Sequence, residues 1–174
     1  MHKTLFWLLS LVCCHAGIIP QPLDTKMRGG NFTLKPGSFI NLPIGTEQTL
    51  LSVLKDNNID LKMAPADAAC AVQLLDERSL PDNYPIPSDE GYVIRVTRDV
   101  INIHAATDAG KFYGLQSLAQ LISSSEKSPD GTFQVPCQDI IDQPRFAWRG
   151  YMLDVSRHFT TTENIKRQLD AMAR

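Results

Sequence analysis

The residues best suited to chemistry lie close to the end of this chain, in the stretch PRFAWRGYMLDVSRHF (residues 144–159). Arg149 carries a planar guanidinium whose N–H donors have fixed directions, so it can bind neighbouring hydroxyls of a ligand. The alternative role for Arg149 is a structural ion pair with Asp154 or a later acid. Asp154 and His158 are suited to supporting hydrogen bonds, whereas Arg157 is expected to pair with a neighbouring acid. The stretch therefore predicts a binding group with polar supports.

The elements around these residues predict one strand and one helix. GYMLDV (residues 150–155) is apolar on both faces, which is typical of a parallel strand buried on both sides. Thr160 and Glu163 form a capping box, and the helix that follows carries one apolar stripe, namely Ile165, Leu169 and Met172. A single strand–helix unit cannot satisfy the backbone of its strand. We therefore expect residues 144–174 to be the truncated start of a larger domain.

Residues 21–140 predict a different unit, a two-layer α+β domain in which a helix covers the strands that precede it. The expected elements are strands within 31–42, 59–63 and 69–75, a helix from Thr46 to Asn57, a proline-rich loop over 80–91, a hairpin over 91–105 and a helix over 109–124. In the last helix Gly110 and Gly114, four positions apart, leave room for a close approach to the sheet. Its inner stripe is expected to be Phe112, Leu115, Ala119 and Ile122, with Thr107 or Asp108 as its cap.

Nothing in this α+β unit indicates catalysis. His104 lies on the hairpin face opposite the apolar stripe, so we expect an exposed or hydrogen-bonded imidazole. Lys111 and Tyr113 are expected at the surface and rim of the packed helix. Cys70 and Cys137 have no nearby histidine partner and predict no metal site; either a disulfide or two free thiols fits them.

The first residues predict export. His2 and Lys3 precede an apolar run from Leu5 to Val12, and small residues follow, with Ala16 as the expected last residue before cleavage. The apolar run is too short to span a bilayer. Residues 1–16 are therefore predicted to be the signal peptide of a secreted or periplasmic protein. A lipid anchor at Cys13 or Cys14 is a weaker alternative. The formal net charge of −2, with scattered Lys and Arg, argues against a nucleic-acid partner.

Two blocks of this sequence resemble a known enzyme family. GYVIRVTRDVINIHAATDAGKFYGLQSLAQLI and DQPRFAWRGYMLDVSRHFTTTENIKRQLDAMA are similar to glycoside hydrolase family 20, the β-N-acetylhexosaminidases. The first block resembles the N-terminal α+β domain of the family, and the second resembles the opening unit of its (β/α)8 TIM barrel. Val100 departs from the family, which often has glycine there; because a β-branched residue resists positive φ, we expect a longer or differently shaped turn.

The resemblance implies hydrolysis of terminal β-linked N-acetylglucosamine or N-acetylgalactosamine from oligosaccharides or glycoconjugates. It implies a retaining, substrate-assisted mechanism that needs no cofactor, in which an adjacent Asp-Glu pair in a later strand does the chemistry. That pair lies beyond this sequence, so no catalytic residue is assigned here. Arg149 matches the family's arginine that hydrogen-bonds hydroxyls of the terminal sugar. Asp154 and His158 lie at the end of the predicted strand and in the loop after it, on the side where the active sites of barrels form.

Two other functions remain open at this point. A free-standing carbohydrate-binding or interaction module would need a complete fold, and the orphan strand over 150–155 argues against it. Another glycosidase with a similar leading domain, such as an α-glucuronidase, would differ in the sequence that follows.

Overall fold

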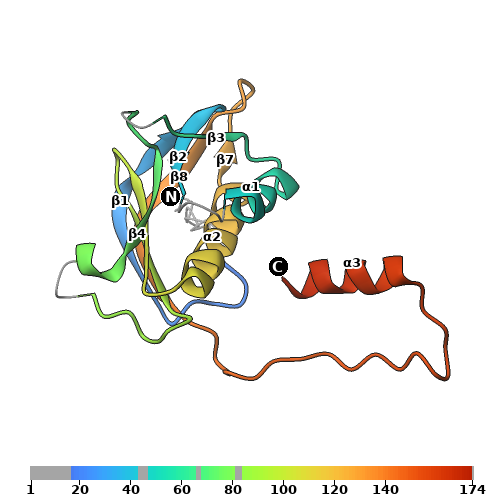
Figure 1. Cartoon of the computed structure of the whole chain (residues 1–174). Coiled ribbons are helices and arrows are strands. Elements are labelled where there is room, and N and C mark those ends of the chain that lie inside the picture. Colours follow the sequence, from blue (N-terminus) through green and yellow to red (C-terminus); the bar gives the residue numbers. More distant parts are fainter. Residues whose placement is uncertain (1–16, 43–46, 66–67, 81–83, 174) are drawn as a thin grey trace, which may run out of the picture.

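The computed structural model describes residues 17–42, 47–65, 68–80 and 84–173. These residues form one mixed sheet, two helices beside it and a C-terminal arm that runs away from it (Figure 1). The elements in chain order are β1 (Asp24–Leu34), β2 (Ser38–Asn41), α1 (Glu47–Asp56), β3 (Leu61–Met63), β4 (Val72–Asp76), the 3-10 turn η1 (Glu77–Ser79), β5 (Tyr92–Val96), β6 (Ile101–Ala105), α2 (Asp108–Ser123), β7 (Glu126–Lys127), β8 (Phe133–Asp142) and α3 (Thr162–Met172).

The sheet has the strand order β1-β8-β5-β6-β4-β2-β3, and β7 pairs with β8 beside this path. β1, β8, β5 and β6 are antiparallel neighbours, whereas β6, β4, β2 and β3 run parallel to one another. The predicted strands within 31–42 both form, but they lie far apart in the sheet. β1 also begins earlier than predicted, at Asp24, because pairing with β8 holds its polar first half.

The hydrophobic core lies between the sheet and its helices. Alternate residues of the hairpin β5–β6 face this core and are fully buried, among them Ile94, Ile101 and Ile103. From α2, Leu115, Ala119 and Ile122 are fully buried as predicted, while Phe112 packs at the margin. α1 adds Val53 and Leu54; its predicted cap, Thr46, lies outside the described residues. The two-layer α+β architecture of this unit is confirmed.

The turn between β5 and β6 has the different shape expected from Val100. The backbone N–H of Thr97 donates to the Val100 carbonyl at 3.0 Å, and the Val100 N–H donates to the Thr97 hydroxyl at 3.1 Å. No residue of this turn has a positive φ. A threonine side chain thus closes the turn where glycine would otherwise supply the left-handed conformation.

Thr107, rather than Asp108, caps α2, and the two predicted glycines set its distance from the sheet. Thr107 accepts a hydrogen bond from the Gly110 N–H at 3.2 Å. A Cβ at Gly110 would lie 2.5 Å from the Gly91 carbonyl oxygen, and one at Gly114 would lie 2.6 Å from Ile103 Cγ2. The sequence spacing therefore predicted a close helix–sheet contact correctly.

Replacing Gly110 with Ala should lower the free energy of unfolding by about 1–3 kcal/mol, because the new methyl group meets a backbone oxygen that cannot move alone. The better helix propensity of alanine offsets part of this cost. Urea unfolding measures the change. Gly150→Ala is the matched control, since no atom lies within 4 Å of its Cβ position. An unchanged midpoint for Gly110→Ala would contradict the close contact.

The other face of the sheet carries a buried polar group on β6. His104 is only 2% exposed; its Nδ1 lies 3.2 Å from the Ser79 hydroxyl, and its Nε2 has no partner among the described residues. Burial lowers the pKa of His104; a backbone hydrogen bond with Asp76 raises it in part, and the charge of Arg95 lowers it further. The imidazole is therefore hydrogen-bonded and neutral, rather than exposed.

The depressed pKa of His104 predicts a loss of stability in mild acid. The unfolded chain binds the proton first, below a pH of about 6.5, so the stabilisation is complete above that pH and is lost as the pH falls toward the lower folded pKa. His104→Gln should flatten the slope of unfolding free energy against pH between about 5 and 7. Equal slopes in wild type and His104→Gln would refute this assignment.

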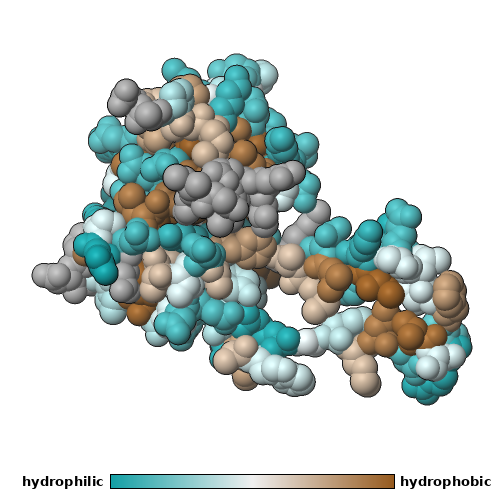
Figure 2. All heavy atoms as spheres, in the orientation of Figure 1, coloured by the Kyte–Doolittle hydropathy of each residue, from teal (hydrophilic) through white to brown (hydrophobic). Residues whose placement is uncertain are grey.

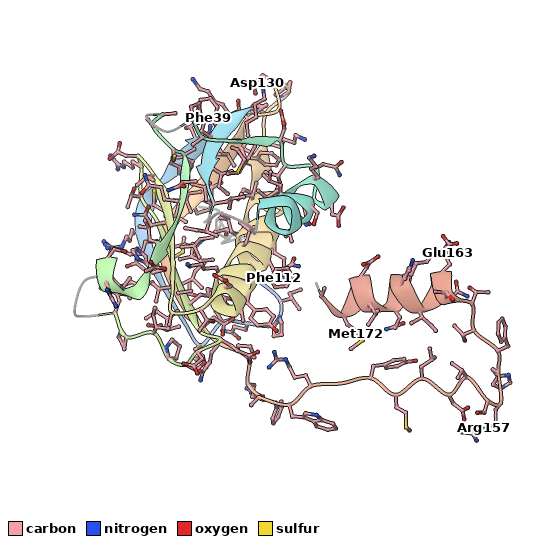
Figure 3. The ribbon with its side chains drawn as sticks, viewed as in Figure 1. Phe39, Phe112, Asp130, Arg157, Glu163 and Met172 are labelled. Carbon is pink, nitrogen blue, oxygen red and sulfur yellow. The ribbon has the colours of Figure 1, made fainter. Side chains whose placement is uncertain are left out.

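The C-terminal arm, residues 143–173, extends from the end of β8 (Figure 1). The predicted strand over 150–155 does not form, because none of the described strands lies alongside it to pair with its backbone. The predicted helix does form as α3, with Thr161 rather than Thr160 as its cap. Glu163 and Met172 lie on opposite sides of it (Figure 3). Of the predicted strand–helix unit, only the helix therefore forms among the described residues.

Candidate functional site

Arg149 is the sequence-predicted site residue that the structure places in a cluster of contacts. Its Nη1 and Nη2 donate to the two carboxylate oxygens of Glu90 at 3.0 and 3.1 Å, which makes a bidentate ion pair. Nη2 also donates to the Tyr113 hydroxyl at 2.8 Å, and Nη1 donates to the Phe146 carbonyl oxygen. The guanidinium lies 5.5 Å from the centre of the Tyr113 ring. Arg149 therefore forms an ion pair, which was the alternative role, but its partner Glu90 precedes it in the sequence, whereas Asp154 or a later acid was expected.

Two of these partners, Glu90 and Tyr113, belong to the α+β unit, so the cluster joins the two parts of the chain. Glu90 lies at the end of the loop before β5, one residue before Gly91, and Tyr113 lies near the start of α2. Hydrogen bonds from Arg149 lower the pKa of Glu90, and the bond to Glu90 raises the pKa of Arg149 although burial opposes it. Both groups are ionised at neutral pH, and both remain more than one-third exposed.

Sequence reasoning missed Glu90 altogether and placed Tyr113 at the rim of α2, where it lies, without linking it to Arg149. They precede Arg149 by 59 and 36 residues, and both lie in segments that were taken as loop and rim. The one local signal is an acid immediately before a buried strand, which is too common to single out a site. Only the path of the chain past the start of α2 brings the three residues together.

The structure does not bring the other predicted residues to Arg149. Asp154 accepts hydrogen bonds from the backbone N–H groups of Ser156 and Arg157 at 3.0 and 3.1 Å and pairs with the Arg157 side chain. These bonds lower the pKa of Asp154, the side-chain bond from Arg157 most strongly. The expected pairing of Arg157 with a neighbouring acid is confirmed. His158 is exposed, and no hydrogen bond or ion pair joins it to Arg149 within the described part of the chain.

Many apolar side chains along the arm are exposed. Trp148 and Met152 are 90% and 92% exposed, and Figure 2 shows apolar residues gathered along the extended segment and α3. The exposed members are Phe146, Trp148, Tyr151, Met152, Leu153, Val155, Phe159, Leu169 and Met172. Such a continuous apolar surface is typical of a region that packs against further protein.

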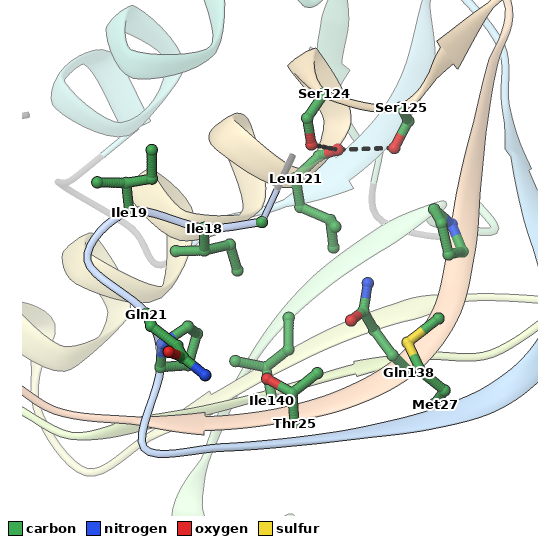
Figure 4. Close-up of a pocket in the computed structure, with 13 residues that line it drawn as sticks. Ile18, Ile19, Gln21, Thr25, Met27, Leu121, Ser124, Ser125, Gln138 and Ile140 are labelled. Carbon is green, nitrogen blue, oxygen red and sulfur yellow. Dashed lines mark hydrogen bonds between the residues drawn. The ribbon is translucent and has the colours of Figure 1, made fainter. Parts of the chain in front are cut away.

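A second feature is a cavity of about 480 Å³ between the segment before β1, the end of α2 and β8 (Figure 4). Ile18, Leu121 and Ile140 supply apolar walls, and the hydroxyls of Ser124 and Ser125 are turned back onto the Leu121 carbonyl. Among the described residues, no titratable side chain lines this cavity.

The described residues hold no group of three or more His, Cys, Asp or Glu that could bind a metal ion. Cys70 and Cys137 are both free thiols, and burial raises the pKa of Cys137. None of the described helices is long and apolar enough to cross a membrane.

Comparison with known proteins defines the class to which this fold and site belong. The relatives are named β-hexosaminidases. The β-hexosaminidase of Porphyromonas gingivalis is 30% identical over a region that covers 90% of this chain and 21% of its own length. The β-hexosaminidase subunit beta of Felis catus is 35% identical over a region that covers 80% of this chain and 21% of its own length. The β-N-acetylhexosaminidase of Bacteroides fragilis superposes with a TM-score of 0.69 at 26% identity, over 89% of this chain and 30% of that one. The chain spans about a fifth of the length of these curated relatives.

Family models assign both parts of the chain. Glycosyl hydrolase family 20, domain 2, matches residues 15–143, and the catalytic domain of the same family matches residues 146–174. The chain therefore belongs to glycoside hydrolase family 20. The α-glucuronidase alternative is set aside, because both matches are to family 20.

Proposed function

We propose that this chain is part of a longer β-N-acetylhexosaminidase that hydrolyses terminal β-linked N-acetylglucosamine or N-acetylgalactosamine. The observation that carries the proposal is the match of residues 146–174 to the catalytic domain of family 20, directly after the match to its domain 2. The relatives named β-hexosaminidase support it. A β-hexosaminidase of Streptomyces plicatus, 28% identical with a TM-score of 0.67 over 88% of this chain and 31% of that one, was solved with its product GlcNAc.

The proposed mechanism is substrate-assisted, with retention at the anomeric carbon. The 2-acetamido oxygen of the sugar attacks the anomeric carbon, and the leaving oxygen takes a proton from a glutamic acid. An adjacent aspartate holds the acetamido nitrogen. The resemblance places both acids in a later barrel strand.

Arg149 is proposed to bind hydroxyls of the terminal sugar. A guanidinium supplies several donors at fixed angles, which suits two hydroxyls on one ring. Glu90 orients this group, which is ionised in any case, in the chain described here. Asp154 and His158 are proposed as supports around the sugar site, since Asp154 lies near the end of the apolar segment 150–155 and His158 lies just after it.

The decisive test compares two lengths of the protein on a chromogenic N-acetylglucosaminide. The 174-residue chain should show no turnover above a catalyst-free control, because it lacks the acid that protonates the leaving group. The chain extended by the downstream reading frame should be active and should contain an adjacent Asp-Glu pair after a strand. Turnover by the 174-residue chain, or an extended chain that only binds the sugar, would overturn the proposal; the second result would favour a carbohydrate-binding module.

We also propose export to the periplasm or the outside of the cell, with cleavage after about Ala16. These residues lie outside the described part of the structure. Mass spectrometry of the exported protein should find a new N-terminus near Gly17. An intact Met1 would contradict export by this route, and a lipid on Cys13 or Cys14 would favour the anchored form instead.

A further inference from the structure

We propose that Glu90 is a positioning residue for Arg149: it anchors the guanidinium to the start of α2, so that the arginine enters the sugar site in one orientation. This inference rests on the sugar-binding role proposed for Arg149. No other acid contacts Arg149 within the described residues.

The first argument is that most N–H donors of the Arg149 guanidinium are already hydrogen-bonded. A guanidinium has five N–H groups, and four of those of Arg149 are engaged, two by Glu90 and one each by Phe146 and Tyr113. The Nε–H remains for a ligand. The Tyr113 hydroxyl is neutral, like a sugar hydroxyl, so a sugar can replace it without a loss of charge pairing. Glu90 cannot be replaced in this way, because a bidentate carboxylate contact is stronger than a contact to a neutral oxygen.

The second argument is the rigidity of the anchor. The residues on both sides of Glu90 are held against α2: the Asp89 carbonyl accepts a hydrogen bond from the Thr107 hydroxyl at 2.5 Å, and the Gly91 carbonyl lies against Gly110. Tyr113 comes from the next turn of the same helix. Glu90 therefore projects from a fixed backbone, which is what the support of a binding group requires.

The third argument is that, among the described residues, Arg149 is the residue through which this part of the arm is bonded to the α+β unit. The flanking residues Phe146 and Trp148 are exposed, and Gly150 has no atom within 4 Å of its Cβ position. At its far end the arm is held by Gln116, whose side chain donates to the Ala173 carbonyl at 2.7 Å. The direction in which the chain leaves the α+β unit therefore depends on the Glu90–Arg149 pair.

Limited trypsin digestion of the 174-residue chain tests the anchor without any activity. The bond after Arg157, which is 83% exposed, serves as the internal reference for the bond after Arg149. Glu90→Gln should raise cleavage after Arg149 several-fold relative to the reference, because the freed segment fits a protease more readily. Glu163→Gln, the same change in an exposed ion pair of α3, should leave the ratio unchanged. An unchanged ratio for Glu90→Gln would overturn the anchor.

Kinetics of the extended enzyme test the positioning role. Glu90→Gln should lower kcat/KM on the order of 10- to 100-fold, as expected when the support of a binding group is lost. The loss should nearly vanish in an Arg149→Lys background and on the single-deoxy substrate that lacks the hydroxyl held by Arg149. Additive losses, or equal losses on every deoxy substrate, would show a merely structural role and overturn the proposal. If the wild-type extended enzyme hydrolyses no N-acetylhexosaminide, the proposed function fails, and digestion alone decides whether Glu90 anchors Arg149.

Discussion

In the extended enzyme, Arg149→Lys should reduce kcat/KM roughly 30- to 1,000-fold, while the protein stays folded. Lysine keeps the charge but loses the planar fork, so it cannot serve two hydroxyls or both oxygens of Glu90. The loss of one or two charge-assisted hydrogen bonds in a closed site corresponds to about 2–4 kcal/mol of transition-state stabilisation. Steady-state kinetics on a chromogenic N-acetylglucosaminide measure the effect.

The melting temperature of the same preparation separates the two roles of Arg149. The ion pair with Glu90 is partly exposed, and such pairs contribute about 0–1 kcal/mol to folding, so the melting temperature should change little. Arg157→Lys is the matched control, since the ion pair that Arg157 forms among the described residues is with its neighbour Asp154. A destabilised Arg149→Lys enzyme with near-normal kcat/KM would reject sugar binding and leave an ion-pair role alone.

Asp139→Asn should lower the free energy of unfolding by about 2–4 kcal/mol, because it removes the one negative charge shared by two arginines in a buried place. Asp139 is 3% exposed on β8. It accepts hydrogen bonds from Arg28 Nε at 2.7 Å and from the Tyr84 hydroxyl at 2.5 Å, and Arg95 Nε lies 3.7 Å away. Asparagine offers one acceptor oxygen in place of two and leaves both guanidinium groups without a counter-charge. Urea unfolding at neutral pH measures the difference from wild type.

The pH dependence gives this prediction a second check. Burial raises the pKa of Asp139, but the hydrogen bonds from Arg28 and Tyr84 and the charges of both arginines outweigh it, and the pKa lies below its ordinary value. The stabilisation is present above the unfolded pKa of about 3.9 and is lost as the pH falls through the lower folded pKa. The gap between wild type and Asp139→Asn should therefore close in strong acid.

Asp24→Asn, an exposed change on the neighbouring strand β1, is the control for Asp139→Asn. It should shift the free energy of unfolding by less than about 0.5 kcal/mol. An equally small shift for Asp139→Asn would show that the arginines find water or other partners, and that the shared carboxylate does not hold β1, β8 and β5 together.

Elements with a strong local pattern were predictable. The hairpin β5–β6 alternates along its length, and α2 combines a capping threonine, an apolar stripe and two spaced glycines. Each of these features acts between residues a few positions apart, so the sequence alone determines them. α3 was predicted on the same grounds and forms even without a core beneath it, because its cap and helix-forming residues are local.

Residues 150–155 show the opposite case. Their apolar pattern predicts a buried strand, yet they stay unpaired and exposed, because a strand is completed only by hydrogen bonds to neighbours. The first residues of β1 are mostly polar, and Gly29 and Gly30 at positive φ follow them where the register with β8 shifts between Met27 and Asn31, so this part carries no strand pattern. It forms a strand because residues 24–27 pair with β8.

The sequence by itself determined the family resemblance and predicted the two-part organisation and a binding role for Arg149, since all of these predictions rest on contiguous motifs. Only the tertiary structure decided what Arg149 contacts. Glu90, Tyr113 and Arg149 come from a loop, a helix and the arm, separated by up to 59 residues, and no local rule links them. The physical reason is that the close packing of α2 on the sheet fixes the position of Glu90, and this packing depends on the whole core.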